Sequence, residues 1–216
     1  MSVSVQESLL DQGGEPALGR LSPQRTPLTR GAWVDVRRGW VTGSGVLFGR
    51  LLEKVPWRAE KRQMYDRVVD VPRLVCFYPE DAELPDPLLA GAREALSAHY
   101  AAELGEPFRT AGLCLYRDGR DSVAWHGDTI GRGSHEDTMV AIVSLGESRP
   151  LLLRPRGGSE GGHEGGRGAA LRYELGHGDL LVMGGSCQRT WEHAVPKMTR
   201  FAGPRVSVQF RPRGVR

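Results

Sequence analysis

Short apolar stretches separated by turn residues dominate the chain after residue 112. Several alternate between apolar and polar positions, which is the period of a β-strand. Their even spacing, without helices between them, predicts an antiparallel sandwich or barrel. The predicted strands are 113–116, 122–128, 139–145, 151–154, 170–174, 179–183, 190–195 and 205–211.

Helical patterns occur only in the first half of the chain. Apolar residues recur at helical spacing between Ser44, a candidate N-cap, and Pro56, which ends the pattern. A second helix is bounded by Asp86, which can cap it, and by Gly105, which can close it. Residues 66–78 predict one or two strands broken near a proline. The fold class is therefore mainly β, in an α+β arrangement.

The organisation along the chain predicts one domain. Residues 1–31 are poor in aromatic residues and rich in Ser, Gln, Pro and Gly, so we expect an extension that is extended or partly disordered. Residues 32–216 form the domain. Within it, residues 157–168 hold seven glycines and predict a flexible loop, because they cannot bury enough apolar area to order themselves.

Composition narrows the class of protein. The 216 residues are 39% hydrophobic and 25% charged, which excludes a mainly disordered chain. No apolar run approaches the roughly 20 residues of a membrane span, so no membrane partner is expected. The net charge of +3 does not by itself mark a nucleic-acid binder. Three cysteines without close spacing and no signal-peptide pattern predict a reducing, cytoplasmic location, and we expect a monomer.

One His-x-Asp pair is a candidate metal site. His126 and Asp128 lie in a predicted strand, so both side chains point to one face, ~7 Å apart at the backbone. His193, in another predicted strand, is the candidate third ligand. Two histidines and one carboxylate leave open positions on an octahedral iron, as in non-heme Fe(II) oxygenases. An isolated His-x-Asp is more often not a metal site, and the pair gains weight only from the last strand.

That last strand, 205–211, alternates strictly between apolar and polar side chains. Read alone, it fits a solvated edge strand. If it neighbours His193, its polar face lines the same interior, where Arg205 needs an anion to offset desolvation. The distal carboxylate of 2-oxoglutarate fits a guanidinium fork. Arg205 and Arg211 are ~20 Å apart along an extended strand, so Arg211 is expected at the iron-proximal end.

The ordered set DSVAWHGD, LGHGDLLVMGG, CQRTWEHAVPK and RVSVQFR resembles the AlkB family of Fe(II)/2-oxoglutarate-dependent dioxygenases. The match covers roughly residues 107–211. The resemblance implies a double-stranded β-helix, or jelly roll, with helices packed on one side. It implies Fe(II), 2-oxoglutarate and dioxygen, with alkylated DNA or RNA as the substrate. Oxidative demethylation of N-alkylated bases would release formaldehyde, succinate and CO2.

The resemblance also assigns residues. His126, Asp128 and His193 match the metal ligands. The remaining matched positions would bind the cosubstrate. They are Tyr116, Arg205, Ser207 and Arg211. Phe77, Tyr78, Ile130 and Trp191 are the candidates for contact with the substrate base.

Several positions depart from the family pattern. Cys114 stands where members have the Asn of an Asn-x-Tyr motif, and Ser207 where many have Asn. Ile130 stands where an acidic side chain often reads the alkylated base. These departures keep two alternatives open: an oxygenase of a small molecule or protein, and a catalytically silent jelly-roll binding module. The intact ligand set and Arg205 argue against the silent module.

Overall fold

The computed structural model describes residues 14–64, 67–157, 170–200 and 202–215, with side chains omitted for 62–70. Residues 1–13 of the expected extension and nearly all of the predicted Gly-rich loop lie outside these ranges. The helices are α1 (Ser44–Lys54), α2 (Pro87–His99), α3 (Ala101–Leu104) and α4 (Cys187–Thr190), with 3-10 turns at Thr29–Gly31 and Arg132–Ser134.

Two antiparallel sheets contain most of the strands. The larger has the order β2 (Gln24–Pro27), β3 (Ala32–Arg37), β12 (Asp179–Gly185), β9 (Val140–Gly146), β14 (Arg205–Arg211), β7 (Thr110–Tyr116), β6 (Arg67–Tyr78) and β5 (Arg58–Met64). The smaller has the order β11 (Leu171–Leu175), β10 (Arg149–Pro155), β13 (Trp191–Val195) and β8 (Val123–His126). A short pair joins β1 (Ala17–Leu18) to β4 (Val41–Thr42).

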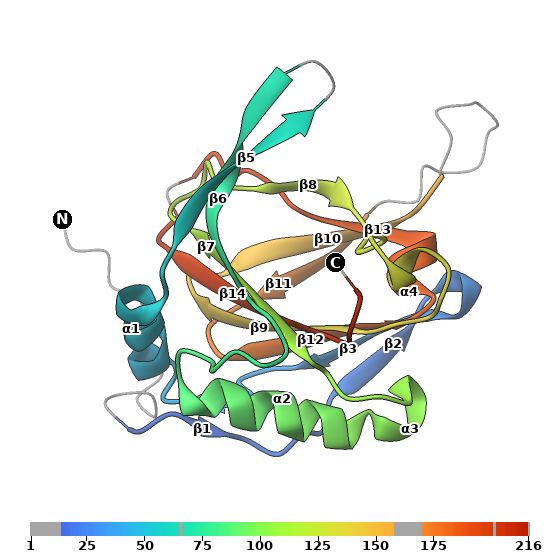
Figure 1. The fold of residues 1–216 in the computed structure, drawn as a ribbon, viewed down its shortest axis with the longest axis horizontal. Helices are drawn as coiled ribbons and strands as arrows, with labels where there is room; N and C mark the ends of the chain where they lie inside the picture. Colours follow the sequence, from blue (N-terminus) through green and yellow to red (C-terminus); the bar gives the residue numbers. More distant parts are fainter. Residues whose placement is uncertain (1–13, 65–66, 158–169, 201, 216) are drawn as a thin grey trace.

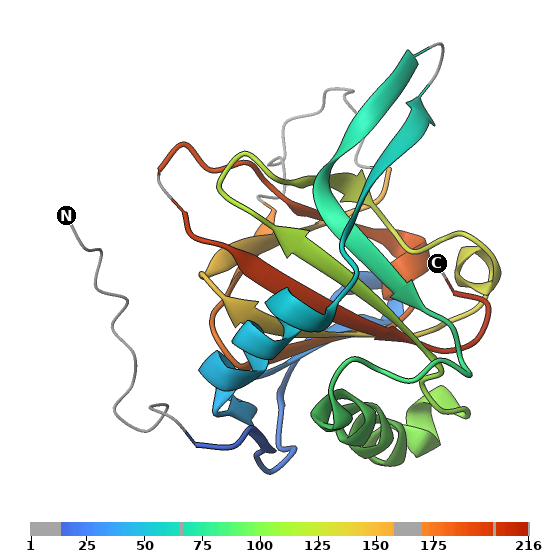
Figure 2. The ribbon, with the colours of Figure 1, turned by 60° about the vertical axis from the view of Figure 1, so that its left-hand side comes forward.

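The two sheets pack face to face as the predicted jelly roll (Figures 1 and 2). Their shared interior is an apolar cluster to which both sheets contribute. Leu153 and Trp191 come from the smaller sheet, and Ile142 and Leu181 from the larger. Side chains alternate between the two faces of each strand, so one face of each sheet can pack against the other sheet to form this sandwich.

A second core lies on the outer face of the larger sheet, where α1 and α2 pack (Figure 2). Leu47 of α1 and Leu96 of α2 are fully buried there. Val206, Val208 and Phe210 of β14 meet them from the sheet. All three are 0% exposed, so β14 is a central strand, and the edge-strand interpretation is wrong.

The helix boundaries follow local chemistry, with one exception. The Asp86 carboxylate accepts a hydrogen bond from Leu88 N and caps α2 as predicted, and Gly105 closes α3 with a φ of 72°. Ser44 is not the N-cap of α1, because the cap is Gly43 in the left-handed region. The Ser44 hydroxyl instead donates to the Val41 carbonyl.

The N-terminal part of the chain belongs to the sheet more than expected. Residues 24–27 are extended, as predicted, but they pair with β3 and so form the edge of the larger sheet. At the opposite edge, β5 and β6 form a hairpin that projects beyond the body (Figures 1 and 2). β6 runs through Pro72 as one strand, although its pairing with β5 is irregular between Asp70 and Leu74. Among the described residues, none of the helices has the length and apolar character for a membrane crossing.

Candidate metal and cosubstrate site

Three predicted metal ligands meet between the two sheets. His126 is the last residue of β8, and His193 lies directly opposite it on β13. Asp128 follows two residues after His126, just beyond the strand rather than in it. One ligand atom from each of the three lies within 4.8 Å of the others. The predicted constellation is therefore brought together.

The protonation states suit a cation. His126 Nδ1 lies 2.9 Å from the Ala124 carbonyl oxygen, which can only accept, so Nδ1 carries the hydrogen and Nε2 is left as the ligand atom. Burial and the nearby His126 lower the pKa of His193 to about 3, so its imidazole is neutral at pH 7. Burial alone would raise the pKa of Asp128, but Arg211 and the two histidines lower it to about 2.

Arg211 and Gln188 fix the carboxylate. Arg211 Nε donates to Asp128 Oδ2 at 2.7 Å, which places Arg211 at the metal end of the site as predicted. The backbone N–H of Asp128 donates to Gln188 Oε1 on α4 at 3.0 Å. Gln188 was not predicted, and its position just before β13 gave no sequence signal. Together these contacts hold Asp128 ionised and aimed at the two imidazoles.

The polar face of β14 lines a stripe that leads away from the metal ligands. Next to Arg211, Gln209 lies against Gly112 of β7. A Cβ added at Gly112 would lie 3.2 Å from Gln209 Oε1 and 3.0 Å from Arg211 Nη1. Gln209 Nε2 donates to Ser207 Oγ at 2.7 Å, and Ser207 is in register with Cys114. The stripe therefore places Ser207 midway along the site, together with Cys114, which departs from the family pattern.

Arg205 and Tyr116 form the far end of the stripe. Arg205 is 1% exposed and donates through Nε to Ser144 Oγ at 2.9 Å. Its guanidinium lies 5.3 Å from the centre of the Tyr116 ring. Burial raises the pKa of Tyr116 to about 12, against the opposing effect of nearby guanidiniums. Both residues lie where the sequence predicted cosubstrate contacts.

This site fits Fe(II) and 2-oxoglutarate. Neutral imidazoles and an ionised carboxylate are the donor set that ferrous iron prefers in oxygenases. Arg205 Nη1 is buried and has no hydrogen-bond partner among the described residues. A buried guanidinium nitrogen without an acceptor is costly, and a ligand carboxylate would satisfy it. His126, Asp128 and His193 would hold the metal, and Arg205 would hold the distal carboxylate.

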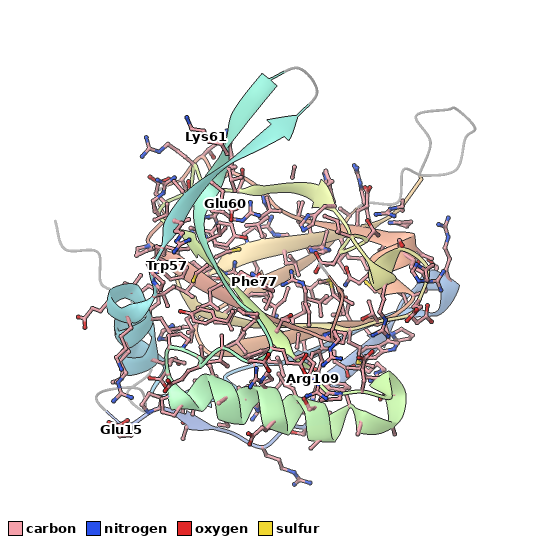
Figure 3. All side chains as sticks on the ribbon, in the orientation of Figure 1. Glu15, Trp57, Glu60, Lys61, Phe77 and Arg109 are labelled. Atoms are coloured by element: carbon pink, nitrogen blue, oxygen red, sulfur yellow. The ribbon has the colours of Figure 1, made fainter. Side chains whose placement is uncertain are left out.

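Of the four candidate substrate residues, two are exposed and two pack against other parts of the protein. Phe77 is 46% and Ile130 is 66% exposed, so both are accessible to a ligand. Phe77 lies on β6 in register with Gly112 (Figure 3). Tyr78, the next residue along β6, points to the opposite face and packs against the helical core. Trp191 is 6% exposed and donates from Nε1 to the Thr29 carbonyl, so it fills the interior behind His193.

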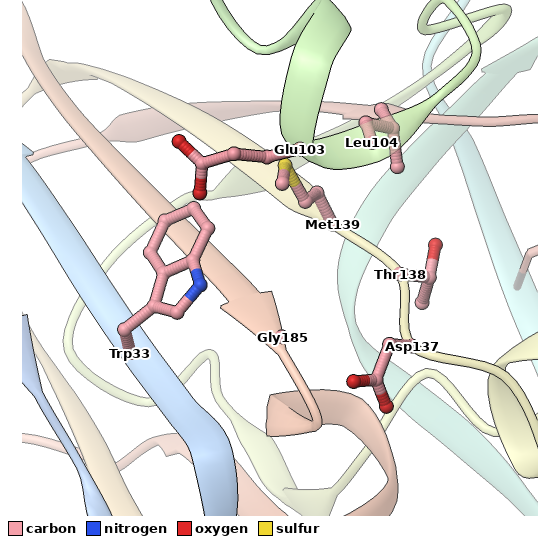
Figure 4. A pocket seen from close by; sticks show the side chains of 7 residues that line it. All are labelled: Trp33, Glu103, Leu104, Asp137, Thr138, Met139 and Gly185. Atoms are coloured by element: carbon pink, nitrogen blue, oxygen red, sulfur yellow. The ribbon is translucent and has the colours of Figure 1, made fainter.

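A separate hollow lies away from this site (Figure 4). It has a volume of about 280 Å³ and contains no metal-ligand or cosubstrate residue. Trp33 of β3 and Glu103 of α3 lie on one side of it, and Asp137 and Thr138 on the other. Arg25 stacks on Trp33 and pairs with Glu103 at 2.8 Å, so the described side chains already satisfy these two groups.

Comparisons with known proteins agree with this geometry. Residues 78–211 match the family described as the 2OG-Fe(II) oxygenase superfamily. Human alpha-ketoglutarate-dependent dioxygenase alkB homolog 3 is 29% identical over 198 residues, which cover 84% of this chain and 66% of that protein. DNA oxidative demethylase ALKBH2 of Arabidopsis thaliana is 29% identical over 195 residues, covering 78% of this chain and 62% of that protein.

A solved structure shares the fold. The structure of OsALKBH1 superposes with a TM-score of 0.57 at 14% identity, covering 88% of this chain and all of that chain. At this identity the likeness concerns the fold alone, and it confirms the predicted jelly roll. The chain spans slightly less than two thirds of the length of the curated relatives described above.

Proposed function

Because the chain belongs to the 2OG-Fe(II) oxygenase superfamily, and within it to the AlkB family, we propose that it is an Fe(II)/2-oxoglutarate-dependent dioxygenase acting in DNA alkylation repair. It would oxidatively demethylate N-alkylated bases in DNA, with RNA as the alternative nucleic acid. The observation that carries the proposal is the metal-ligand cluster at one end of a buried stripe and Arg205, whose buried Nη1 has no partner among the described residues, at the other.

The residues of the chain have distinct tasks in this reaction. When bound, Fe(II) and 2-oxoglutarate supply the oxidation of an N-methyl group by dioxygen, with formaldehyde, succinate and CO2 as products. His126, Asp128 and His193 would hold the ion and leave coordination positions open. Arg211 keeps Asp128 ionised, and Arg205 orients the keto acid by its far end. The two sheets exclude water from the stripe between them.

Side chains around the metal ligands support a nucleic-acid substrate. Arg154 of β10 lies over the Trp125 ring of β8 at 4.3 Å and pairs with Glu192 of β13 at 2.9 Å, on the outward face of the smaller sheet. A Cβ at Gly127 would lie 3.0 Å from Arg156 Nη2, so a second guanidinium lies beside the ligand loop. Such groups suit phosphates, and exposed Phe77 suits stacking on a base that has left its helix.

A second candidate function is the oxidation of a small molecule or protein side chain. Ile130 favours it, because an exposed apolar side chain stands where AlkB members often carry an acidic one. The silent binding module is disfavoured, since Arg205 would then be buried without an anion. We further propose that the protein is monomeric and cytoplasmic. Its free cysteines, Cys76, Cys114 and Cys187, suit a reducing compartment.

Mass spectrometry of a panel of methylated oligonucleotides tests the proposal. Each is incubated with the protein, Fe(II) and 2-oxoglutarate, and base mass, formaldehyde and succinate are measured. The expected result is loss of a methyl group from at least one oligonucleotide, and none with His193→Ala. Succinate release without any change in nucleic acid would favour the second candidate. Absence of succinate with every substrate would contradict both.

The salt dependence of binding tests the nucleic-acid part separately. If guanidiniums contact phosphates, the affinity for a methylated oligonucleotide falls steeply as salt rises. Fluorescence anisotropy between low and moderate salt measures this dependence. A Kd that does not change with salt would contradict a phosphate-binding surface. Arg154→Gln should reduce the slope, while the distant Arg38→Gln is a matched control.

A further inference from the structure

Arg149 is a second buried arginine that the sequence did not single out. It is the first residue of β10 and is 0% exposed. On this strand Leu151 and Leu153 share its face, and both belong to the interior between the sheets. Arg149 therefore points into the same interior as His193 and Arg205, from the sheet opposite Arg205.

Backbone carbonyls hold the guanidinium in place. Nη1 donates to Asp118 O at 3.0 Å, and Nη2 donates to Asp121 O at 2.8 Å and Pro196 O at 2.9 Å. The first two carbonyls precede β8, which ends at His126. The third follows β13, which carries His193. Arg149 thus ties together the far ends of the two strands that bear the imidazole ligands.

These contacts leave the guanidinium without a direct ion pair in the described part of the chain. Within the described ranges, no carboxylate forms an ion pair with Arg149, and its Nε is buried without a hydrogen-bond partner. Burial lowers the pKa of Arg149, as it does for Arg205, because each cation loses its hydration. The nearby Asp121 and Asp118 carboxylates oppose the lowering of the Arg149 pKa only in part. Carbonyl dipoles replace part of that hydration but do not cancel the charge.

Arg149 and Arg205 converge on one aromatic ring. The Arg149 guanidinium lies 5.5 Å from the centre of Tyr116 and that of Arg205 lies 5.3 Å from it. Two buried positive charges near one another disfavour the folded protein unless an anion joins them. The metal ligands lie at the other end of the stripe, so the pair concentrates positive charge at the end away from the metal.

We propose that Arg149 is a positioning residue for the distal carboxylate of the cosubstrate, acting as a fixed second charge opposite Arg205. The inference rests on the proposed function, because it assumes that a keto-diacid occupies the stripe. Arg205 would form the direct hydrogen bonds. Arg149, held by three carbonyls, would favour a ligand with a charged far end over one with an apolar far end.

Calorimetric titration of the Mn(II)-loaded protein tests this role without turnover. The two ligands are 2-oxoglutarate and 2-oxopentanoate, which keeps the keto-acid end and chain length but lacks the distal carboxylate. Arg149→Gln should weaken 2-oxoglutarate binding by about tenfold or more and leave 2-oxopentanoate nearly unchanged. Arg149→Lys should retain most of the preference, because it keeps the charge. Arg172→Gln, exposed on the neighbouring strand β11, should bind both ligands as the wild type does.

The outcomes separate the two proposals. Wild-type protein that binds neither ligand would contradict the proposed function itself. Arg149→Gln that weakens both ligands equally, or neither, would overturn the positioning role and leave the function standing. If Arg149→Gln does not fold, the wild-type complex with 2-oxoglutarate decides by crystallography. A distal carboxylate more than about 6 Å from the Arg149 guanidinium would overturn the inference.

Discussion

Single side chains of this protein take their properties from burial and from one or two charged neighbours. Asp128 is the clearest case, since burial opposes its ionisation and Arg211 enforces it. The sequence predicted His126, Asp128 and His193, because the polar face of the last strand and the family resemblance gave weight to a His-x-Asp pair that is weak alone. It did not indicate Arg149 or Gln188, because their value comes from backbone carbonyls and N–H groups that only the folded chain brings near.

Removing the anchor at the far end should change cosubstrate use specifically. We expect Arg205→Ala to raise the apparent 2-oxoglutarate requirement by tens-fold, since a charge-assisted hydrogen bond contributes about 1.5–3 kcal/mol. The measurement is succinate release at varied 2-oxoglutarate. The requirement of Arg205→Lys should lie between those of the wild type and Arg205→Ala, because Lys keeps the charge and loses the bidentate geometry of the guanidinium. An unchanged requirement in the alanine variant would place the anchor elsewhere.

The metal-free protein should lose stability as the pH falls from about 6.5. The pKa of His193 is about 3 when folded and has an ordinary value of 6.5, so the unfolded chain binds the extra proton first. Asp128, with a pKa of about 2 against 3.8, adds a further loss below pH 3.8. Thermal melts from pH 7 to pH 3 measure this trend. His193→Asn should flatten the plot of melting temperature against pH near pH 6.5. A variant with the same slope as the wild type would show that His193 does not cause this loss of stability.

At the scale of elements, alternation explains both the successes and the errors of prediction. The bounds of the last strand agree with the sequence pattern because Val206, Val208 and Phe210 alternate with polar residues. Tyr78 was wrongly placed at the site, since neighbouring residues of β6 cannot share a face. Trp191 lies on the correct face, yet the pattern could not distinguish lining a cavity from filling a core.

The cap of α2 provides a test at this scale. Asp86→Ala should lower the free energy of unfolding by about 1 kcal/mol, because Leu88 N loses its acceptor. Asp86→Asn should lose less, since an amide oxygen also caps a helix. Chemical denaturation measures both variants. Because α2 covers the outer face of the larger sheet, 2-oxoglutarate affinity should stay unchanged in each, and a clear loss would show that the helix reaches the site.

The whole molecule has an apolar core on each side of the larger sheet, and the metal-ligand and cosubstrate residues lie on one side only. The helices cover the outer core, and the interior between the sheets combines its own apolar cluster with the residues of the site. The even spacing of the strands predicted an antiparallel sandwich or barrel, and the family resemblance specified the jelly roll. Pairing partners such as β2 with β3 were not predictable, because register depends on contacts between distant segments.

Matched truncations on the two sides should behave differently. Leu113→Ala, in the outer core, and Leu153→Ala, in the interior, should each cost about 2–5 kcal/mol of stability. Leu153 pairs in register with His193, so its truncation should also weaken Mn(II) binding. Leu113→Ala should leave metal affinity near the wild-type value. Thermal melts and metal titrations compare the pair, and equal metal affinities would contradict the division.

The position of β14 in the middle of the larger sheet limits how this protein can change over evolution. A one-residue insertion or deletion within 205–211 would turn its arginines toward the helices and its valines toward the ligand stripe. Both cores would lose their packing together, so such a change would unfold the protein rather than reduce its activity. New cosubstrate preferences must therefore arise through substitutions at every second position, which keep the register of the strand.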